Sequence, residues 1–206
     1  MRKTLLSLLI LAVLLVFGGG GWLGYQVFTT GFSAKTEPHA LEAMLARQIR
    51  HLAIPIEKRN LPNPVPMSPA VLKESLAHFA DHCSICHAND GSGQTPIGKN
   101  VFPKAPDLRL QDTQSLSDGE LFFTIHNGIR FTAMPAFGEE EPDKDLGSWK
   151  LVHFIRHLPQ LTQDELDEMK ALNPKTKHEL EKEVSSDKFL QGNDAAAAQA
   201  GTGHHH

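Results

Sequence analysis

Cys83-Ser84-Ile85-Cys86-His87 is the stretch of this 206-residue chain that decides its fold. It holds both cysteines of the sequence, three positions apart, and a histidine directly follows the second one. On a helical turn, residues three apart share one face, so both sulfurs can form thioether bonds to neighbouring edges of one macrocycle. His87 then lies next to the second thioether, where its imidazole can bind an iron. The stretch therefore predicts one covalently bound haem c, attached through Cys83 and Cys86.

Other uses of two neighbouring cysteines fit the sequence less well. A four-ligand zinc site needs a second pair of ligands, and the chain has no further cysteine. A thioredoxin-like redox pair belongs in a βαβ context, which the helical, proline-broken sequence around it lacks. Haem attachment uses both sulfurs, so we expect no disulfide.

The excess of acidic over basic residues limits which kinds of partner the chain can bind. The chain has 20 basic and 24 acidic residues, and segment 1–34 contributes Arg2 and Lys3 but no acid. The rest of the chain therefore has 18 basic and 24 acidic residues, a formal charge of −6. Such a surface argues against nucleic acid as a partner and favours a redox protein with a basic docking surface.

An uncharged run of 25 residues, from position 4 to 28, dominates segment 1–34. As a helix it is about 37 Å long, more than the ~30 Å hydrocarbon core of a bilayer. Trp22 and Tyr25 lie near its outer end, where interfacial aromatic residues belong. We therefore predict a transmembrane anchor with its basic end inside and the rest of the chain exported. A leucine-rich start and four glycines at 18–21 also suit a cleaved secretory signal, which would leave a soluble protein.

The remainder divides into three parts. Segment 35–67 contains an amphipathic helix, which packs on the haem domain or lies at the membrane surface, and a linker from Ala53 to Met67. Its prolines predict that this linker is stiff and extended. Segment 68–160 is the haem domain, and segment 161–206 is a short helix with a disordered tail. The tail ends in His204-His205-His206, either a weak metal tract or a plain terminus. The helix has apolar residues at helical spacing: Leu41, Met44, Leu45, Ile49 and Leu52.

Helix signals surround the haem motif. Ser68-Pro69 pairs an N-cap serine with a proline at the first helical position, so a helix begins there and runs into the motif. Ser117-x-x-Glu120 and Thr162-x-x-Glu165 are capping boxes that open two short helices. Another helix is expected to begin at Pro142-Asp143 and to stop at Pro159. No strand pattern persists along the chain, so the predicted fold class is all-α.

The iron of a haem held by His87 needs a ligand on its other face. Met134 is the leading candidate because Pro135 pushes it out of the α-region into an extended loop, from which a thioether can project. The apolar neighbours are expected to keep water off the iron: Phe131, Ala136 and Phe137. Met134 could instead be core filler, as most methionines are.

Other candidate ligands are weaker. Met67 lies in the predicted linker. His126, His153 and His157 lie on predicted helices, where lone histidines are more often surface or satisfied core residues than ligands.

Residues 68–158 resemble a class I cytochrome c, close to the small single-haem modules found beside bacterial respiratory complexes and periplasmic dehydrogenases. Phe79 stands four residues before the first cysteine, where that family keeps an aromatic residue. Ser75 stands where the family more often has glycine. The stretch 151–158 resembles the family's C-terminal helix, with Phe154 in the aromatic position. Two further stretches match its haem-loop and distal-methionine segments: Ala105-Pro106-Asp107-Leu108 and Met134-Pro135-Ala136-Phe137-Gly138.

The resemblance implies a class I cytochrome c fold and one-electron transfer by a haem with His87 and Met134 as axial ligands. It also implies that a proline carbonyl, from Pro103 or Pro106, orients the histidine. Three residues are candidate partners of the haem propionates: Arg109, Arg130 and Trp149.

On this interpretation the protein is an electron carrier and not an enzyme, and it needs no small-molecule substrate. It belongs at the bacterial inner membrane with the haem domain facing the periplasm, and it could be a subunit of a respiratory oxidase or dehydrogenase complex. Two rival classes stay open. In a peroxidase-like haem enzyme Met134 would be displaced from the iron, and in a metal-handling protein the twelve histidines would bind metal.

Overall fold

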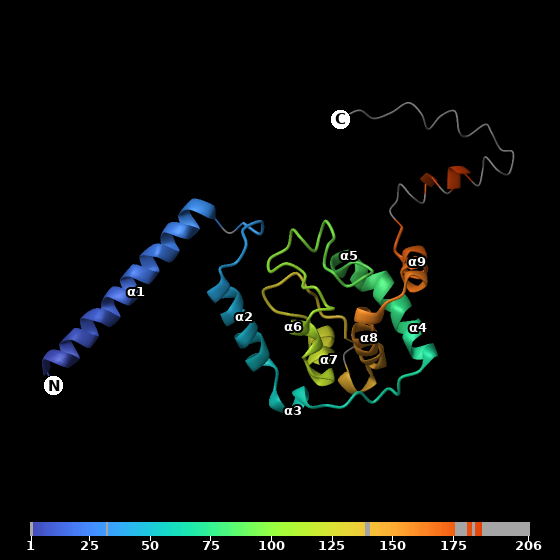
Figure 1. Cartoon of the computed structure of the whole chain (residues 1–206), viewed down its shortest axis with the longest axis horizontal. Coiled ribbons are helices and arrows are strands. Elements are labelled where there is room, and N and C mark those ends of the chain that lie inside the picture. Colours follow the sequence, from blue (N-terminus) through green and yellow to red (C-terminus); the bar gives the residue numbers. More distant parts are fainter. Residues whose placement is uncertain (1, 32, 139–140, 176–180, 183, 187–206) are drawn as a thin grey trace.

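The structure is a computed structural model of the chain, and it describes residues 2–31, 33–138, 141–175, 181–182 and 184–186. Every regular element in this part of the chain is a helix, which confirms the predicted all-α class. Figure 1 shows the long helix α1 (Arg2–Thr30), then α2 (Ala40–Ala53), then a cluster of shorter helices. Most of the tail predicted to be disordered, including His204-His205-His206, lies outside the described residues.

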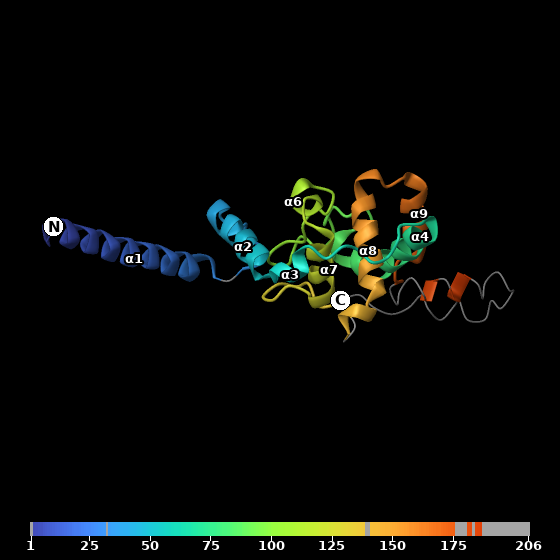
Figure 2. The same ribbon diagram turned by 90° about the horizontal axis from the view of Figure 1, so that it is seen from below.

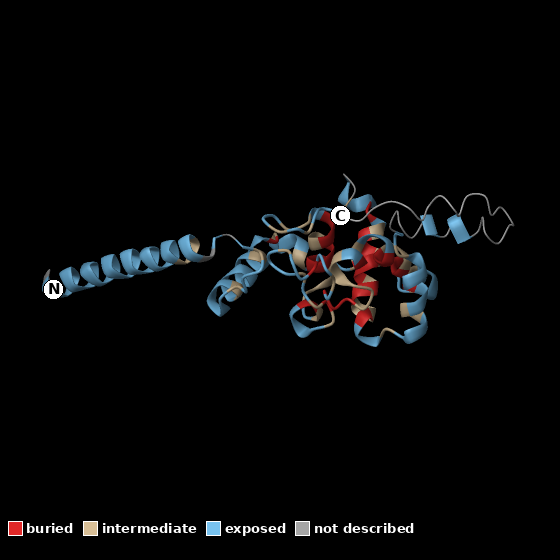
Figure 3. Ribbon diagram, turned by 90° about the horizontal axis from the view of Figure 1, so that it is seen from above, coloured by how far each residue is buried: buried red, intermediate tan, exposed pale blue. Residues whose placement is uncertain are grey.

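Helix α1 confirms the helix expected over positions 4–28. Its apolar stretch, Lys3–Thr29, has 27 residues, and its 18-residue window has a mean hydropathy of 2.3 with none of the window buried. By length and composition this helix can cross a membrane. Figure 3 shows that burial is confined to the cluster of helices beyond α2.

The haem motif ends a nearly continuous helical segment. It consists of α4 (Pro69–His78), the π-helical turn η1 (Phe79–Cys83) and α5 (Ser84–His87). The predicted start is confirmed, since the Ser68 hydroxyl accepts a hydrogen bond from the Val71 amide at 3.2 Å. The remaining elements are α3 (Ile56–Arg59), α6 (Gln111–Gln114), α7 (Asp118–Asn127), η2 (Pro142–Lys144), α8 (Leu146–His157), η3 (Leu158–Gln160) and α9 (Gln163–Leu172).

Local capping explains where these helices begin. Both predicted capping boxes are present, at Ser117 with Glu120 and at Thr162 with Glu165. The predicted start at Pro142 is wrong for α8, because Pro142–Lys144 forms only a 3-10 turn. Asp145 then leaves the helical region, at φ −77° and ψ 67°, and its carboxylate accepts the Ser148 amide at 3.0 Å. Helix α8 therefore begins at Leu146, directly after its N-cap Asp145, and not at Pro142.

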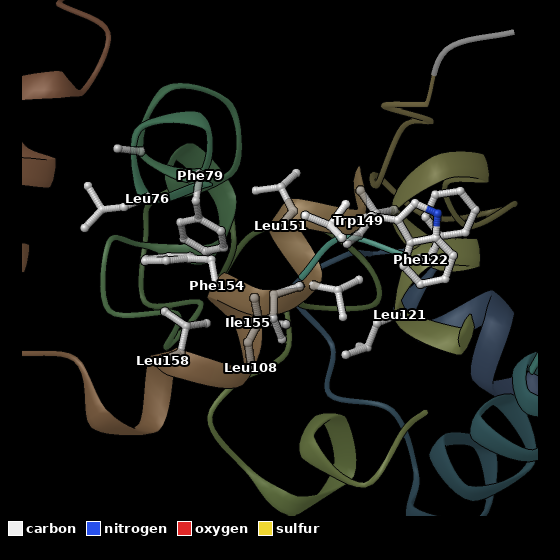
Figure 4. Packing of buried hydrophobic residues seen from close by; sticks show 14 of the residues in the cluster. Leu76, Phe79, Leu108, Leu121, Phe122, Trp149, Leu151, Phe154, Ile155 and Leu158 are labelled. Carbon is white, nitrogen blue, oxygen red and sulfur yellow. The ribbon is translucent and has the colours of Figure 1, made fainter. Parts of the chain in front are cut away.

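Helix α8 packs against α4 and α7 and organises the core. Phe79 of η1 and Phe154 of α8 are 1% and 0% exposed, with ring centroids 4.9 Å apart (Figure 4). At the other end of α8, Trp149 stacks on Phe122 of α7 at 4.1 Å and 7° (Figure 4). Aromatic pairs of this kind bury large apolar areas. Here they hold η1 and α7 against α8.

Ser75 of α4 stands where class I cytochromes c more often have glycine, and its side chain is buried. It is 1% exposed, and its hydroxyl donates to the Leu72 carbonyl at 2.9 Å. A buried hydroxyl with a partner inside its own helix carries little cost, so the close approach of α4 to the core survives the substitution.

The segment from Ala53 to Met67 is not the extended linker that its prolines predicted. It contains helix α3, which packs against α7. A Cβ on Gly119 of α7 would lie 2.2 Å from the Lys58 carbonyl oxygen, so the two backbones touch. The hydroxyl of Ser117 also donates to the carbonyl of Arg59.

The second half of this segment joins the core of the haem domain. Val65 is 9% exposed and belongs to the main apolar cluster. Asn63 donates its side-chain amide to the Trp149 carbonyl at 3.0 Å, and His153 lies 2.7 Å from the Val65 carbonyl through Nε2. Because these contacts and the burial of Val65 join the segment to α8, it is fixed to the haem domain and does not act as a spacer.

Candidate functional site

The two cysteines occupy the junction of η1 and α5, at the edge of the core. Burial, and then the neighbouring Cys86, raises the pKa of the Cys83 thiol to about 12. Burial also raises the pKa of Cys86. Redox-active and thiolate-ligand cysteines need a lowered pKa, so neither thiol suits those roles. Their role in covalent attachment stays a prediction of the motif.

His87 closes α5 with its ring largely enclosed. Burial lowers the pKa of His87, and the nearby Pro106 backbone carbonyl acts on the ring in the opposite direction. Among the described residues, Nδ1 is buried and reaches no acceptor at full hydrogen-bond geometry. A neutral imidazole with one nitrogen beside a backbone carbonyl is the form that ligates a metal through the other nitrogen. Of the two prolines considered, Pro106 is the one whose carbonyl acts on this ring.

The loop after the motif folds tightly back on it. The Gly93 amide donates to the His87 carbonyl at 2.8 Å, and the Thr95 hydroxyl donates to the Cys86 carbonyl at 3.2 Å. Gly93 has a positive φ of 72°, and a Cβ there would lie 2.4 Å from the Ala105 carbonyl oxygen. The loop therefore brings Pro106 to His87, and this conformation requires a glycine at position 93.

Met134 lies in a turn in which its backbone amide and its backbone carbonyl are both hydrogen-bonded. Its amide donates to the Thr132 hydroxyl at 3.1 Å, and its carbonyl accepts the Ile129 amide at 3.2 Å. Gly128 opens the loop with φ 65°, and a Cβ there would lie 2.6 Å from the Ala136 amide nitrogen. The Met134 side chain is partly exposed, so the structure does not bury it as core filler.

The far end of this loop is attached to a buried, hydrogen-bonded pair of His126 and Asp145. Nδ1 of His126 lies 2.7 Å from Oδ2 of Asp145, and the two side chains are 9% and 5% exposed. The His126 ring also stacks on Phe122 at 5.3 Å. Gly138 lies directly on that ring, and its amide donates to the His126 carbonyl at 3.0 Å. No local pattern predicted this pair, because its two members are 19 residues apart.

The expectation that three apolar neighbours of Met134 keep water off the iron stays a prediction. Phe131 is 94% exposed, and Ala136 is exposed too. Phe131 has a φ of 63°, which is uncommon for a bulky residue and turns its side chain outward. Of the three apolar neighbours, Phe137 packs against the core.

The three candidate propionate partners lie in different surroundings, and their roles stay predictions. The Arg109 guanidinium pairs with Asp107 through Nε at 2.9 Å and Nη2 at 2.7 Å, and with Asp90 through Nη1 at 3.0 Å. The hydrogen bond from Arg109 lowers the pKa of Asp107. Arg130 is exposed in the Met134 loop, and Trp149 belongs to the core.

The three helical histidines each have a partner in the structure. Besides the His126 pair and the His153 contact, His157 lies 2.8 Å from a carboxylate oxygen of Glu165 through Nε2. Met67 is 52% exposed at the surface of the domain. None of these side chains therefore needs an iron to explain its position.

A cleft of about 490 Å³ is lined by residues of α4, η1, α8 and α9, and its lining extends to His82, the residue before Cys83. His78 and His82 line it, with ring centroids 5.0 Å apart. Burial, and then His82, lowers the pKa of His78. Within the described residues, however, no group of three or more histidines, cysteines or carboxylates could hold a metal ion.

An all-helical domain with a C-x-x-C-H motif at the end of its first helix, and a neutral, enclosed histidine in that motif, is a c-type cytochrome domain. Residues 70–155 match the family model described as "Cytochrome C oxidase, cbb3-type, subunit III". The match confirms the c-type cytochrome prediction for this part of the chain and implies covalently bound haem c. No curated protein matches the chain.

Proposed function

We propose that the chain is a membrane-anchored, single-haem electron carrier with His/Met axial ligation. Cys83 and Cys86 form the two thioether bonds, and His87 is the proximal ligand. The observation that carries the proposal is the position of His87 at the end of α5, directly after both cysteines, with its Nδ1 buried. Its lowered pKa and the Pro106 carbonyl that acts on the ring agree with it. That environment keeps the ring neutral and oriented, as an iron ligand requires.

Met134 is the proposed distal ligand. Haem c, when bound, supplies a one-electron iron couple whose potential depends on the axial ligands. A thioether favours the reduced iron more than a second imidazole does, so Met134 raises the potential. Met134 bound to the iron would leave no free position for peroxide, which favours a carrier over the peroxidase-like alternative.

The membrane and the partner belong to the same proposal. Helix α1 is the anchor, with Arg2 and Lys3 on the inner side and the haem domain in the periplasm. The family description concerns a respiratory oxidase, and this supports electron exchange with a membrane-bound respiratory complex. The acidic surface predicted from the composition suits a donor or acceptor with a basic docking surface.

The distal ligand is tested on the full-length protein by the near-infrared sulfur-to-iron charge-transfer band of the oxidised form. Met134→Ala should abolish the band, lower the reduction potential and let carbon monoxide bind. Met134→His should keep a six-coordinate, low-spin iron at a lower potential, because imidazole stabilises the oxidised iron better. Met67→Ala is the matched control, since Met67 is 52% exposed, and it should change nothing. A band that persists in Met134→Ala would show that another residue is the ligand.

A further inference from the structure

Helix α2 has an apolar stripe with no partner in the described part of the chain. Leu41, Leu45, Ile49 and Leu52 follow the spacing of one helix face. They are 63%, 49%, 65% and 70% exposed, and no residue of α2 is buried. We call these four residues the α2 stripe. A strongly amphipathic helix whose apolar side is uncovered calls for an apolar surface outside the domain.

The polar side of α2, and not the stripe, faces the haem domain. Nδ1 of His51 lies 2.8 Å from Oε1 of Glu120 on α7, whose side chain is 7% exposed. On a helical wheel, position 51 falls on the flank of the stripe next to Met44, roughly 115° from the centre of the stripe. The partly shielded Ala43 and Arg50 lie on the side opposite the stripe. This arrangement is the reverse of a helix that packs on a core. The stripe therefore points away from the haem domain.

Helix α2 begins beside the membrane-spanning helix. The ring of Trp22 in α1 lies 5.4 Å from the ring of His39, the residue before α2. Trp22 is eight residues from the end of α1, so the chain folds back by about 12 Å to this level. Tryptophan prefers the boundary between acyl chains and headgroups, and the start of α2 is therefore at that boundary.

The direction of α2 agrees with this position. Figures 1 and 2 show α2 between α1 and the haem domain, running across the direction of α1 and not along it. If α1 crosses a bilayer, a helix that runs across it at the level of Trp22 lies along the bilayer surface. Since the α2 stripe points away from the haem domain, it points to the side where α1 lies.

We propose that α2 is an interfacial helix that inserts the α2 stripe into the outer surface of the bilayer. The partner of the α2 stripe is lipid, and the four side chains lie among the upper acyl-chain segments. Arg47 and Arg50, on the other sides of the helix, remain at the level of the headgroups and water. This inference rests on α1 being the membrane anchor in the proposed function.

Rigid attachment gives the interfacial helix a consequence for electron transfer. Arg59 of α3 donates from Nε to the Ile54 carbonyl at 2.8 Å and from Nη2 to the Leu52 carbonyl at 3.2 Å. Ile54, which ends α2, is 5% exposed, and α3 is in backbone contact with Gly119 of α7. These contacts join α2 to the haem domain. The haem domain is therefore held at one height and tilt above the membrane, and it does not swing on a free tether.

Photocrosslinking of the full-length holoprotein in lipid vesicles tests the inference. The photoreactive residue p-benzoylphenylalanine is placed singly at Leu45 on the stripe, at Arg47 on the opposite side, and at Leu14 within α1. Leu14 tests the anchor itself. Positions 45 and 47 are both exposed and two residues apart, so they form a matched pair that differs only in the direction it faces. We expect lipid adducts at 14 and 45, and at least tenfold fewer at 47.

The outcomes separate the two ideas. Lipid adducts at 14 together with protein adducts at 45, to a second copy or to another protein, would overturn the interfacial helix and leave the anchor intact. Equal yields of lipid adducts at 45 and 47 would do the same. Absence of lipid adducts at 14 would overturn the anchor, and the interfacial helix with it.

Discussion

Gly138→Ala is the substitution that best tests how the Met134 loop is held. A Cβ at this position would lie 1.9 Å from Nδ1, 2.3 Å from Cγ and 2.6 Å from Cε1 of His126. Real Cβ atoms do not approach other atoms so closely, so either the ring or the loop must move by more than 1 Å. The ring is held by Asp145 at 2.7 Å and by its stacking on Phe122.

Free energies decide which one moves. Displacing the His126 ring breaks a buried hydrogen bond to a carboxylate, which costs about 1.5–3 kcal/mol. Displacing the loop breaks two backbone hydrogen bonds, from Gly138 to His126 and from Phe137 to Ile125, at about 0.5–1.5 kcal/mol each. The loop route is the cheaper or equal one, so we expect the loop to move. The loss of about 1–3 kcal/mol lowers the equilibrium for the methionine-bound form roughly 5- to 150-fold.

Thermal titration of the near-infrared band provides the assay. The oxidised Gly138→Ala protein should lose the band at a temperature several degrees below the wild type, by the size scaling of a domain with about 90 residues. Gly147→Ala is the matched control, because the nearest atom to a Cβ there is 3.6 Å away and helix α8 gains from alanine. If Gly138→Ala kept the band and the stability of the wild type, the loop would not depend on the His126 ring.

Two further predictions concern stability. Burial alone would raise the pKa of Asp145, but hydrogen bonds from His126 and Ser148 outweigh it and bring the pKa below 3.8. A lowered folded-state pKa stabilises the protein above the unfolded pKa, and this stability is lost as the pH falls through the folded value. Asp145→Asn should therefore lose about 1–3 kcal/mol at pH 7 and depend less on pH below 4, as denaturant unfolding followed by circular dichroism would show; an unchanged acid profile would contradict the pairing. Phe79→Ala should cost about 3–5 kcal/mol in the same assay, and a double-mutant cycle with Phe154→Ala should give a coupling of about 0.5–1.5 kcal/mol, whereas strict additivity would argue against direct packing.

Local chemistry explains the parts of the fold that were predictable. The cap at Ser68 and the capping boxes at Ser117 and Thr162 use partners three residues away, so a single sequence contains the whole interaction. The end of α8 before Pro159 follows from a proline that cannot continue a helix. The haem motif is equally local, because its five residues are consecutive.

The candidate site was predictable only in part. The spacing of the motif predicts Cys83, Cys86 and His87 as haem-binding residues, and Pro135 predicts Met134 as the second ligand. These roles stay predictions. The choice of Pro106 over Pro103 needed the fold of the loop, since both carbonyls are available to a single sequence. The outward turn of Phe131 needed its backbone angle, which an apolar neighbourhood does not reveal.

Sequence by itself determined the class of protein, the covalent haem chemistry and most helix boundaries, because these depend on contacts within one helical turn. Tertiary structure decided the pairing of His126 with Asp145, the docking of residues 53–67 and the direction of the α2 stripe. The reason is the length of chain between the partners. Asp145 needs His126 across 19 residues, Arg59 meets Ser117 across 58, and Asn63 reaches Trp149 across 86. Contacts this distant leave no periodic pattern in a single sequence, so only the folded chain reveals them.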